Sequence, residues 1–274
     1  MQLQVLVATM GQKDFSLAEK MNLRQNAVIA NQCGQWRLEE CRREFGGMQM
    51  LSSDTKGVGL NRNLALQLAK ADILLFADDD VTYYDGTLQG VIDAFRELPD
   101  ADVIFFAMDY TQNGEIIDRR RHKTKRLHTW NSLRYGAARM AIRREAVEKN
   151  RLAFSPLFGG GCRYSSGEDT LFILDAIRSG LRVYSHSYVL GSCAKDSSSW
   201  FSGYHEKYFY DRGALVACAF PKTKHWMKWY FAWKISRKAK TPLNTVLRQM
   251  NLGIRGFRSL TAYGVPEQAK EELQ

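Results

Sequence analysis

A short apolar run that ends in three consecutive aspartates constrains the fold of this 274-residue chain more than any other feature. The run Ile73–Ala77 (ILLFA) is typical of a strand that is buried on both faces of a parallel sheet. Asp78, Asp79 and Asp80 follow at its carboxyl end, which is the edge where open α/β sheets bind ligands. Leucines and alanines at helical spacing in residues 57–69 predict a helix just before it.

Three adjacent carboxylates repel one another, so a positive charge nearby must compensate their negative charge. A hard divalent cation would compensate the charge, because Mg²⁺ and Mn²⁺ prefer oxygen ligands and often bridge carboxylates to a phosphate. The alternative is a solvated acidic turn after a strand. The triplet alone leaves both interpretations open, and the buried strand before it favours the metal site.

The first half of the chain alternates between strand and helix patterns. Strands are expected at residues 3–8, 26–30, 48–51, 73–77 and 102–108, and helices at 17–23, 57–69 and 87–97. This alternation predicts an α/β fold with a mostly parallel, doubly wound sheet. We expect residues 48–51 to form its edge strand, and the basic run 119–126 (RRRHKTKR) to be a solvated loop.

A second acidic pair, Glu168 and Asp169, opens a predicted helix after two glycine-containing segments, LFGGG and SSG. Acidic residues in a first turn stabilise the helix dipole, which is one interpretation. The glycines favour another, because they let the backbone approach a ligand or let a lid move. A carboxylate that faced the Asp78–Asp80 edge from here would serve as a general base.

The sequence excludes or disfavours several classes of protein. The segment Gly57-Val58-Gly59 lacks the third glycine of a dinucleotide fingerprint, because position 62 is Arg. No P-loop and no G-x-S-x-G elbow is present. We expect no transmembrane helix and no signal peptide. The five scattered cysteines show no C-x-x-C spacing, which favours a reducing, cytoplasmic compartment.

Positive charge is concentrated near the C-terminus. Residues 212–266 contain eleven Lys or Arg and no Asp or Glu, whereas the whole chain has a net charge of +10. We therefore expect two domains, residues 1–211 and a basic helical extension, residues 212–274. Within the extension, Trp226, Trp229, Tyr230 and Trp233 recur at helical spacing.

Two interpretations of the extension remain open. It is either a helix packed on the body with its charges in water, or a pair of interfacial helices. Trp and Tyr suit the headgroup layer, and Lys and Arg suit anionic lipid, so the second interpretation predicts a membrane surface as partner. No RNA or DNA motif accompanies the basic residues, and we expect no nucleic-acid partner.

Five segments in order, VLVAT, VIANQCG, GVGLNRNLAL, ILLFADDDV and LFGGGCRYSSGEDTLF, resemble family 2 inverting glycosyltransferases with the GT-A fold. The resemblance covers about residues 3–189, and the aspartate triplet together with the later Glu-Asp pair makes it specific. It implies a GT-A domain over residues 1–211 that binds a nucleotide sugar and a divalent cation, Mn²⁺ or Mg²⁺.

The resemblance also assigns roles. It implies that Asp78 contacts the sugar nucleoside, that Asp79 or Asp80 binds the metal, and that Asp169 is the base that deprotonates the acceptor hydroxyl. Arg62 matches the family's Arg-Asn pair and is expected to face the nucleotide.

Thr9, Asn31, Gln32 and Glu168 complete the expected donor-binding residues. The family's second strand usually ends in an Asp that reads uracil, and Asn31-Gln32 stands there. An amide still pairs with a base edge, so we expect nucleotide binding to survive there, and the identity of the base stays open. The expected donor is a nucleotide sugar, with UDP as the expected nucleotide.

Together these expectations describe a metal-dependent inverting glycosyltransferase of polysaccharide biosynthesis. It would transfer a sugar to a glycan or lipid-linked acceptor, as a peripheral protein on the cytoplasmic face of the inner membrane. The reaction needs a cation at the leaving diphosphate and a base at the attacking hydroxyl, and the two acidic sites would supply them. The alternative is a non-catalytic nucleotide- or polyanion-binding protein on the same fold.

Overall fold

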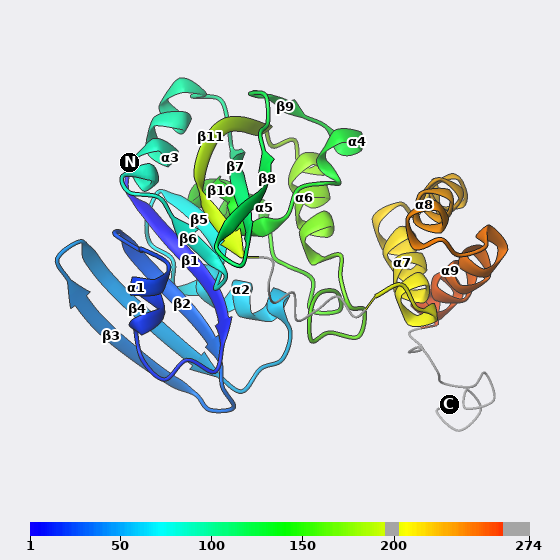
Figure 1. Ribbon diagram of the computed structural model, residues 1–274, viewed down its shortest axis with the longest axis horizontal. Coiled ribbons are helices and arrows are strands. Elements are labelled where there is room, and N and C mark those ends of the chain that lie inside the picture. The colour runs from blue at the N-terminus through cyan, green and yellow to red at the C-terminus, as the bar shows by residue number, and fades with distance from the viewer. Residues whose placement is uncertain (195–202, 260–274) are drawn as a thin grey trace. The chain divides into compact units, whose positions relative to one another are not determined.

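The computed structural model describes residues 1–194 and 203–259 (Figure 1). Contacts divide the chain into two compact units, which are described separately below. The first comprises residues 1–156 and 168–198, and the second comprises residues 157–167 and 199–274. The domain boundary expected after residue 211 falls inside helix α7 (Glu206–Ala219), which lies wholly in the second unit. The division into domains 1–211 and 212–274 stays a prediction.

One large mixed sheet forms the centre of the first unit. Its strand order is β3-β4-β2-β1-β5-β10-β7-β11-β6, with β8 beside β7 and β9 beside β11. The strands are β1 (Leu3–Met10), β2 (Asn26–Gln32), β3 (Arg37–Arg43), β4 (Gly46–Ser53), β5 (Ile73–Asp78), β6 (Val81–Tyr83), β7 (Val103–Gln112), β8 (Glu115–Arg120), β9 (Lys125–Leu127), β10 (Met140–Arg143) and β11 (Val183–Ala194). Strands β4, β2, β1 and β5 run parallel, as do β7 and β11, and β10 is antiparallel between β5 and β7.

Helices cover both faces of this sheet. They are α1 (Ser16–Lys20), α2 (Val58–Leu68), α3 (Thr87–Glu97), α4 (Thr129–Ser132), the 3₁₀ helix η1 (Ala137–Arg139), α5 (Arg144–Asn150) and α6 (Glu168–Arg178). Side chains alternate along β1, so Val5 and Val7 enter one core with Val91 of α3, while Leu6 enters a second core with Phe172 of α6. The doubly wound arrangement expected from the sequence is confirmed.

The strand register brings the expected polar positions to one edge of the sheet. Thr9 pairs with Asn31 across β1 and β2, and Ala8 pairs with Asp78 across β1 and β5. The three strands run in the same direction, so their carboxyl ends coincide. Thr9, Asn31 and Asp78 therefore share the edge at which a ligand is expected.

Two expectations about the sheet and its loops were wrong. Residues 48–51 lie in β4, and the edge strand is β3, which pairs antiparallel to β4. The sequence of β3, RLEECRR, lacks an apolar run because an edge strand is largely exposed to water. The basic run 119–126 is only partly a loop, because β8 extends to Arg120 and β9 begins at Lys125.

In the second unit, residues 206–258 are mainly helical. It contains α7 (Glu206–Ala219), α8 (Lys224–Ala239) and α9 (Leu243–Arg258). Helices α7 and α9 approach closely at two glycines: a Cβ on Gly213 would collide with the backbone of Met250, and one on Gly253 with the carbonyl of Tyr210. Within the described residues, no helix is long and apolar enough to span a bilayer.

The short strand β6 leads to our first prediction. It follows the aspartate triplet and is held by β11, where Gly191 pairs with Tyr83. A Cβ on Gly191 would collide with the carbonyl oxygen of Thr82, which is backbone and cannot rotate away. We expect Gly191→Ala to lower the free energy of unfolding by about 1–3 kcal/mol, the usual range for overpacking, as measured by urea denaturation.

Gly47→Ala is the matched control, because Gly47 also lies in a strand and its added Cβ would meet nothing closer than 3.9 Å. The control should change stability by less than about 0.5 kcal/mol. Equal stability of the two variants would contradict the tight β11–β6 contact.

Candidate active site

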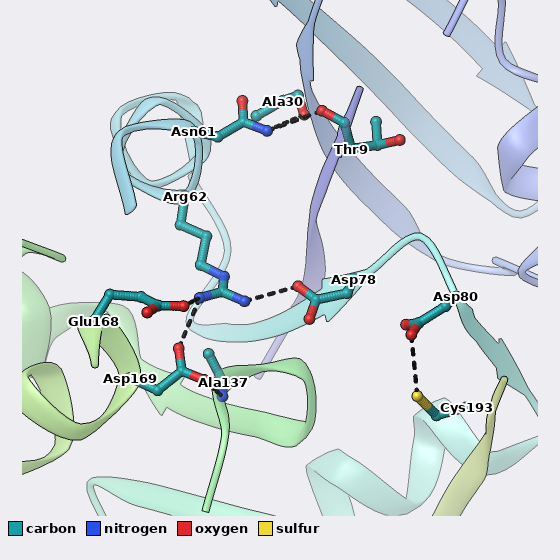
Figure 2. Close-up of polar contacts among 10 residues, drawn as sticks. All are labelled: Thr9, Ala30, Asn61, Arg62, Asp78, Asp80, Ala137, Glu168, Asp169 and Cys193. Carbon is teal, nitrogen blue, oxygen red and sulfur yellow. Dashed lines mark hydrogen bonds and ion pairs between the residues drawn. The ribbon is translucent and has the colours of Figure 1, made fainter. Parts of the chain in front are cut away.

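The three consecutive aspartates have three different partners, and Figure 2 shows those of Asp78 and Asp80. Asp78, the last residue of β5, accepts a hydrogen bond from Arg62 Nη2 at 2.8 Å. Asp79 accepts one from the Thr9 hydroxyl at 2.6 Å, and Asp80 accepts one from the Cys193 thiol at 3.3 Å. The chain turns at Asp79 and Asp80, between β5 and β6, so the three carboxylates reach different partners.

Asp80 is the most perturbed of the three. Burial and the nearby charge of Asp78 raise its pKa to about 6. Its Oδ1 is buried and has no hydrogen-bond partner within the described part of the chain. Burial also raises the pKa of the Cys193 thiol, so this group stays a neutral donor to Asp80. A buried carboxylate oxygen without a partner is costly, and a bound cation would remove that cost.

Arg62 joins the two acidic sites predicted from the sequence. Its guanidinium is only 4% exposed and donates to Asp78, to Asp169 at 2.7 Å and to Glu168 at 3.3 Å (Figure 2). Burial opposes its charge, but the three carboxylates outweigh burial and raise the pKa of Arg62. One cation faces three acids, so the cluster carries excess negative charge when all three are ionised. The donor-binding role of Arg62 stays a prediction; in the structure its contacts are carboxylates.

Asp169 has the features of a base held in place. Its Oδ1 accepts from Arg62, and its Oδ2 accepts from the backbone N–H of Ala137 in η1 at 3.0 Å. Burial, assisted by the charge of Asp78, raises the pKa of Asp169 even though Arg62 acts in the opposite direction. The side chain is 26% exposed, so a substrate hydroxyl can reach it. A raised pKa makes a carboxylate a stronger proton acceptor.

Helix α2 is fixed to the sheet edge by a side chain that sequence reasoning did not select. Asn61 donates to the carbonyl of Thr9 at 3.0 Å and to that of Ala30 at 2.9 Å (Figure 2). These bonds tie the N-terminal part of α2 to the carboxyl ends of β1 and β2. The helix begins after Gly57, whose φ of +105° favours glycine. Arg62 is therefore positioned by contacts of its two neighbours, Asn61 with the strand ends and Asn63 with the backbone of Phe154.

Two predicted donor contacts serve the protein itself. Asn31 is fully buried; its Oδ1 accepts from the N–H of Gln12, and its Nδ2 donates to the carbonyl of Gln12 and to Ser52. Gln32 donates to Thr55 and to the carbonyl of Gly57. Both amides shape the loops at the ends of β1 and β2, and base recognition by them stays a prediction.

The oxygen ligands at the triplet fit a hard divalent cation. Asp79 is exposed, and Asp80 has a buried oxygen without a partner among the described residues. No cluster of three His, Cys, Asp or Glu side chains in a metal-binding arrangement occurs in residues 1–194 and 203–259. A cation here would therefore take its remaining ligands from phosphate oxygens and water, which is the usual coordination of Mg²⁺.

Sequence reasoning missed Asn61, Cys193 and the Ala137 N–H. Cys193 comes from β11, 113 residues after Asp80, and a single cysteine carries no signal of such a contact. The Ala137 N–H belongs to the backbone and has no sequence signature. Asn61 stands beside Arg62, and the Arg-Asn pattern that drew attention to Arg62 used Asn63 instead. In the structure Asn63 anchors the helix to Phe154.

Comparison with known proteins gives a match to one family model and several similar folds. The model of the family described as glycosyl transferase family 2 matches residues 28–151. A search of curated protein sequences found no significant match. The solved structure of S. aureus TarS 1–349 in complex with UDP-GlcNAc is similar, with a TM-score of 0.63, 15% identity and coverage of 96% of this chain and 93% of that chain.

A second structure of TarS 1–349, in complex with UDP, has a TM-score of 0.59 and 18% identity, and covers 100% of this chain and 78% of that chain. Identities this low support the fold and no more. The resemblance and the fold class expected from the sequence are both confirmed, as is the glycosyltransferase class: residues 28–151 match the family 2 model, and the fold is that of GT-A glycosyltransferases.

Proposed function

We propose that this chain transfers a sugar from a UDP-linked donor to a hydroxyl of a glycan or lipid-linked acceptor, with inversion and with the help of Mn²⁺ or Mg²⁺. The observation that carries the proposal is the pair of acidic sites joined by buried Arg62, because donor activation and acceptor deprotonation need separate carboxylates at one place. The S. aureus TarS structures, whose ligands are UDP-GlcNAc and UDP, support a UDP-linked donor.

Asp79 and Asp80 would hold the cation in this proposal. A cation there supplies Lewis-acid stabilisation of the leaving diphosphate. Thr9 orients Asp79, and Cys193 orients Asp80. Asp78 remains the residue for the sugar nucleoside, since it is 38% exposed and Arg62 occupies only one of its oxygens.

Asp169 would act as the base. Its carboxylate takes the proton of the acceptor hydroxyl while the hydroxyl oxygen bonds to the anomeric carbon and the bond from that carbon to the diphosphate oxygen breaks. Arg62 and the Ala137 N–H hold the carboxylate in one orientation. Attack from the face opposite the leaving group inverts the configuration, as in inverting glycoside hydrolysis.

The membrane surface is the second partner that we propose. The three tryptophans of α8 are exposed, with Trp226 at 81%, Trp229 at 54% and Trp233 at 52%. The helix buries a different set, Met227, Ala232 and Ile235, so the aromatic stripe is not what holds the unit together. Lysine and arginine side chains lie over these rings, such as Arg237 at 5.1 Å from Trp233. This combination suits an anionic headgroup layer and supports a peripheral location on the cytoplasmic face of the inner membrane.

The alternative is a non-catalytic nucleotide- or polyanion-binding protein on this fold. A panel of UDP sugars with Mn²⁺ separates the two, first by thermal shift and then by release of UDP, since a ligand that binds only the folded state stabilises it. An enzyme releases UDP from the sugar that stabilises it. A binding protein is stabilised and releases none, and that result would refute the proposed function.

The second prediction concerns Asp80→Asn. The raised pKa of Asp80 means that its stability contribution is present below the unfolded value of about 4 and is lost as the pH rises through about 6. The neutral amide removes this loss, so the variant should be at least as stable as the wild type at pH 8 in urea denaturation with a chelator present. It should nevertheless lose Mn²⁺-dependent UDP binding, measured by calorimetry.

Asp93→Asn is the matched control, because Asp93 is an exposed carboxylate on α3 that pairs with Arg96. It should leave UDP binding intact. Wild-type UDP binding by Asp80→Asn would show that Asp80 is not a metal ligand.

The third prediction concerns Asp169→Asn. The amide keeps the shape of the side chain and accepts from Ala137, but it takes no proton. UDP binding should stay near the wild-type level, while the rate of UDP release from the sugar donor should fall by a factor on the order of 10² to 10⁴. Asp175→Asn on the same helix is the control, because Asp175 is exposed and pairs with nearby Arg178. If UDP binding falls in proportion to the rate, Asp169 has a structural role instead.

The fourth prediction concerns vesicle binding. The full chain should sediment with vesicles rich in phosphatidylglycerol, less strongly at 1 M salt because screening weakens only the charged contacts. Replacement of Trp226, Trp229 and Trp233 by Ser should abolish binding at high salt, with little effect on folding because these side chains are exposed.

Trp36→Ser with Trp130→Ser is the matched control, since these residues are 57% and 69% exposed in the first unit. Equal vesicle binding by the two variants would remove the membrane from the proposal, and so would no binding by the wild type.

A further inference from the structure

A basic groove of about 510 Å³ lies in the first unit, and the proposed function does not use it. Every residue that the structure describes along it is Arg, Lys or His. The Lys and Arg residues are Arg119, Arg121, Lys123, Lys125, Arg134 and Arg139. Most of them belong to the basic run 119–126, which the sequence predicted to be a solvated loop.

The groove is assembled by the fold from two separate parts of the chain. One part is the end of β8, the connection to β9 and the start of β9; the other is the segment from the end of α4 through η1. Like charges that are brought close together destabilise one another. A solvated loop would let them separate, whereas β8 and β9 are held to β7 and β11 by strand pairing.

Two side chains of the groove are fixed by contacts. Arg121 pairs with the buried carboxylate of Asp109 on β7, at 2.5 Å. Burial alone would raise the pKa of Asp109, but the hydrogen bonds from Arg121 and Tyr84 hold it below its ordinary value. Arg139 is 5% exposed and bonds to His122 Nε2 at 2.9 Å. Arginine only donates, so His122 accepts this bond as a neutral imidazole.

The groove adjoins the candidate base. The three-residue helix η1 begins with Ala137, whose N–H binds Asp169, and ends with Arg139, which lines the groove. The groove therefore starts beside Asp169, on the side of β7 and β11. The predicted donor residues Thr9 and Asn31 lie on the side of β1 and β2.

We propose that this groove binds a phosphate group of the acceptor, and so holds the acceptor with its hydroxyl at Asp169. Lysine and arginine are the residues that recognise phosphate, and several of them around one groove match an acceptor with more than one phosphate. This inference rests on the proposed function, because it assigns the groove to the acceptor of that same reaction.

Inorganic tripolyphosphate is the probe, and its binding to the full chain is measured by calorimetry without metal at 0.15 M salt. Lys123→Gln with Lys125→Gln should weaken binding by roughly tenfold or more, since two charge-assisted contacts are lost. Both lysines are exposed, so the variant should fold normally. Lys20→Gln with Lys149→Gln removes two exposed lysines elsewhere in the first unit and should bind tripolyphosphate like the wild type.

Equal tripolyphosphate affinity of the two double-lysine variants would overturn the proposal, as would no binding by the wild type. Loss of binding to phosphatidylglycerol vesicles by Lys123→Gln/Lys125→Gln, with unchanged tripolyphosphate affinity, would assign the groove to membrane headgroups instead. Different results would overturn the groove proposal and the proposed function. UDP binding without tripolyphosphate binding overturns the groove alone, whereas tripolyphosphate binding without UDP binding overturns the proposed function and, with it, the acceptor assignment.

Discussion

The buried guanidinium of Arg62 is the interaction on which the candidate site depends. It contacts Asp78 at the end of β5 and both acids at the start of α6, so it connects elements that are about a hundred residues apart in the chain. Without it, three carboxylates would meet in a poorly solvated place, where an unpaired charge is strongly unfavourable. The three ion pairs of Arg62 therefore explain why a charged side chain occupies the interior beside the sheet edge.

The sheet turns this local interaction into a site with two functions. The parallel strands β1, β2 and β5 end together, so the metal-binding and donor-binding candidates gather on one side of Arg62. Helix α6 and the 3₁₀ helix η1 place Asp169 on its other side. This division matches a reaction in which a cation stabilises the leaving group and a base deprotonates the attacking hydroxyl. The basic groove extends the acceptor side of the same arrangement.

Local pattern was enough to predict the strand that ends at Asp78, the helix that begins at Glu168 and the doubly wound sheet, because each depends on residues that are close in sequence. It failed at β3, where an exposed edge strand carries no apolar run, and at the basic run, where strand pairing overrides charge. The divergence of Asp78, Asp79 and Asp80 could not be predicted either. Their partners are Arg62, Thr9 and Cys193, and the distances along the chain to Thr9 and Cys193 are 70 and 113 residues. Such contacts are set by the fold as a whole.

A double-mutant cycle between Arg62→Met and Asp169→Asn, measured by urea denaturation at pH 8, tests the central claim most directly. If Arg62 stabilises the ionised base, the second substitution should cost less once the first is made. The two effects should then differ from additivity by about 1–3 kcal/mol, as for residues in one buried ionic network. Arg62→Met with Asp175→Asn provides the comparison, since Asp175 pairs elsewhere. Additive effects in both cycles would contradict the account, because Arg62 would then not join the two acidic sites.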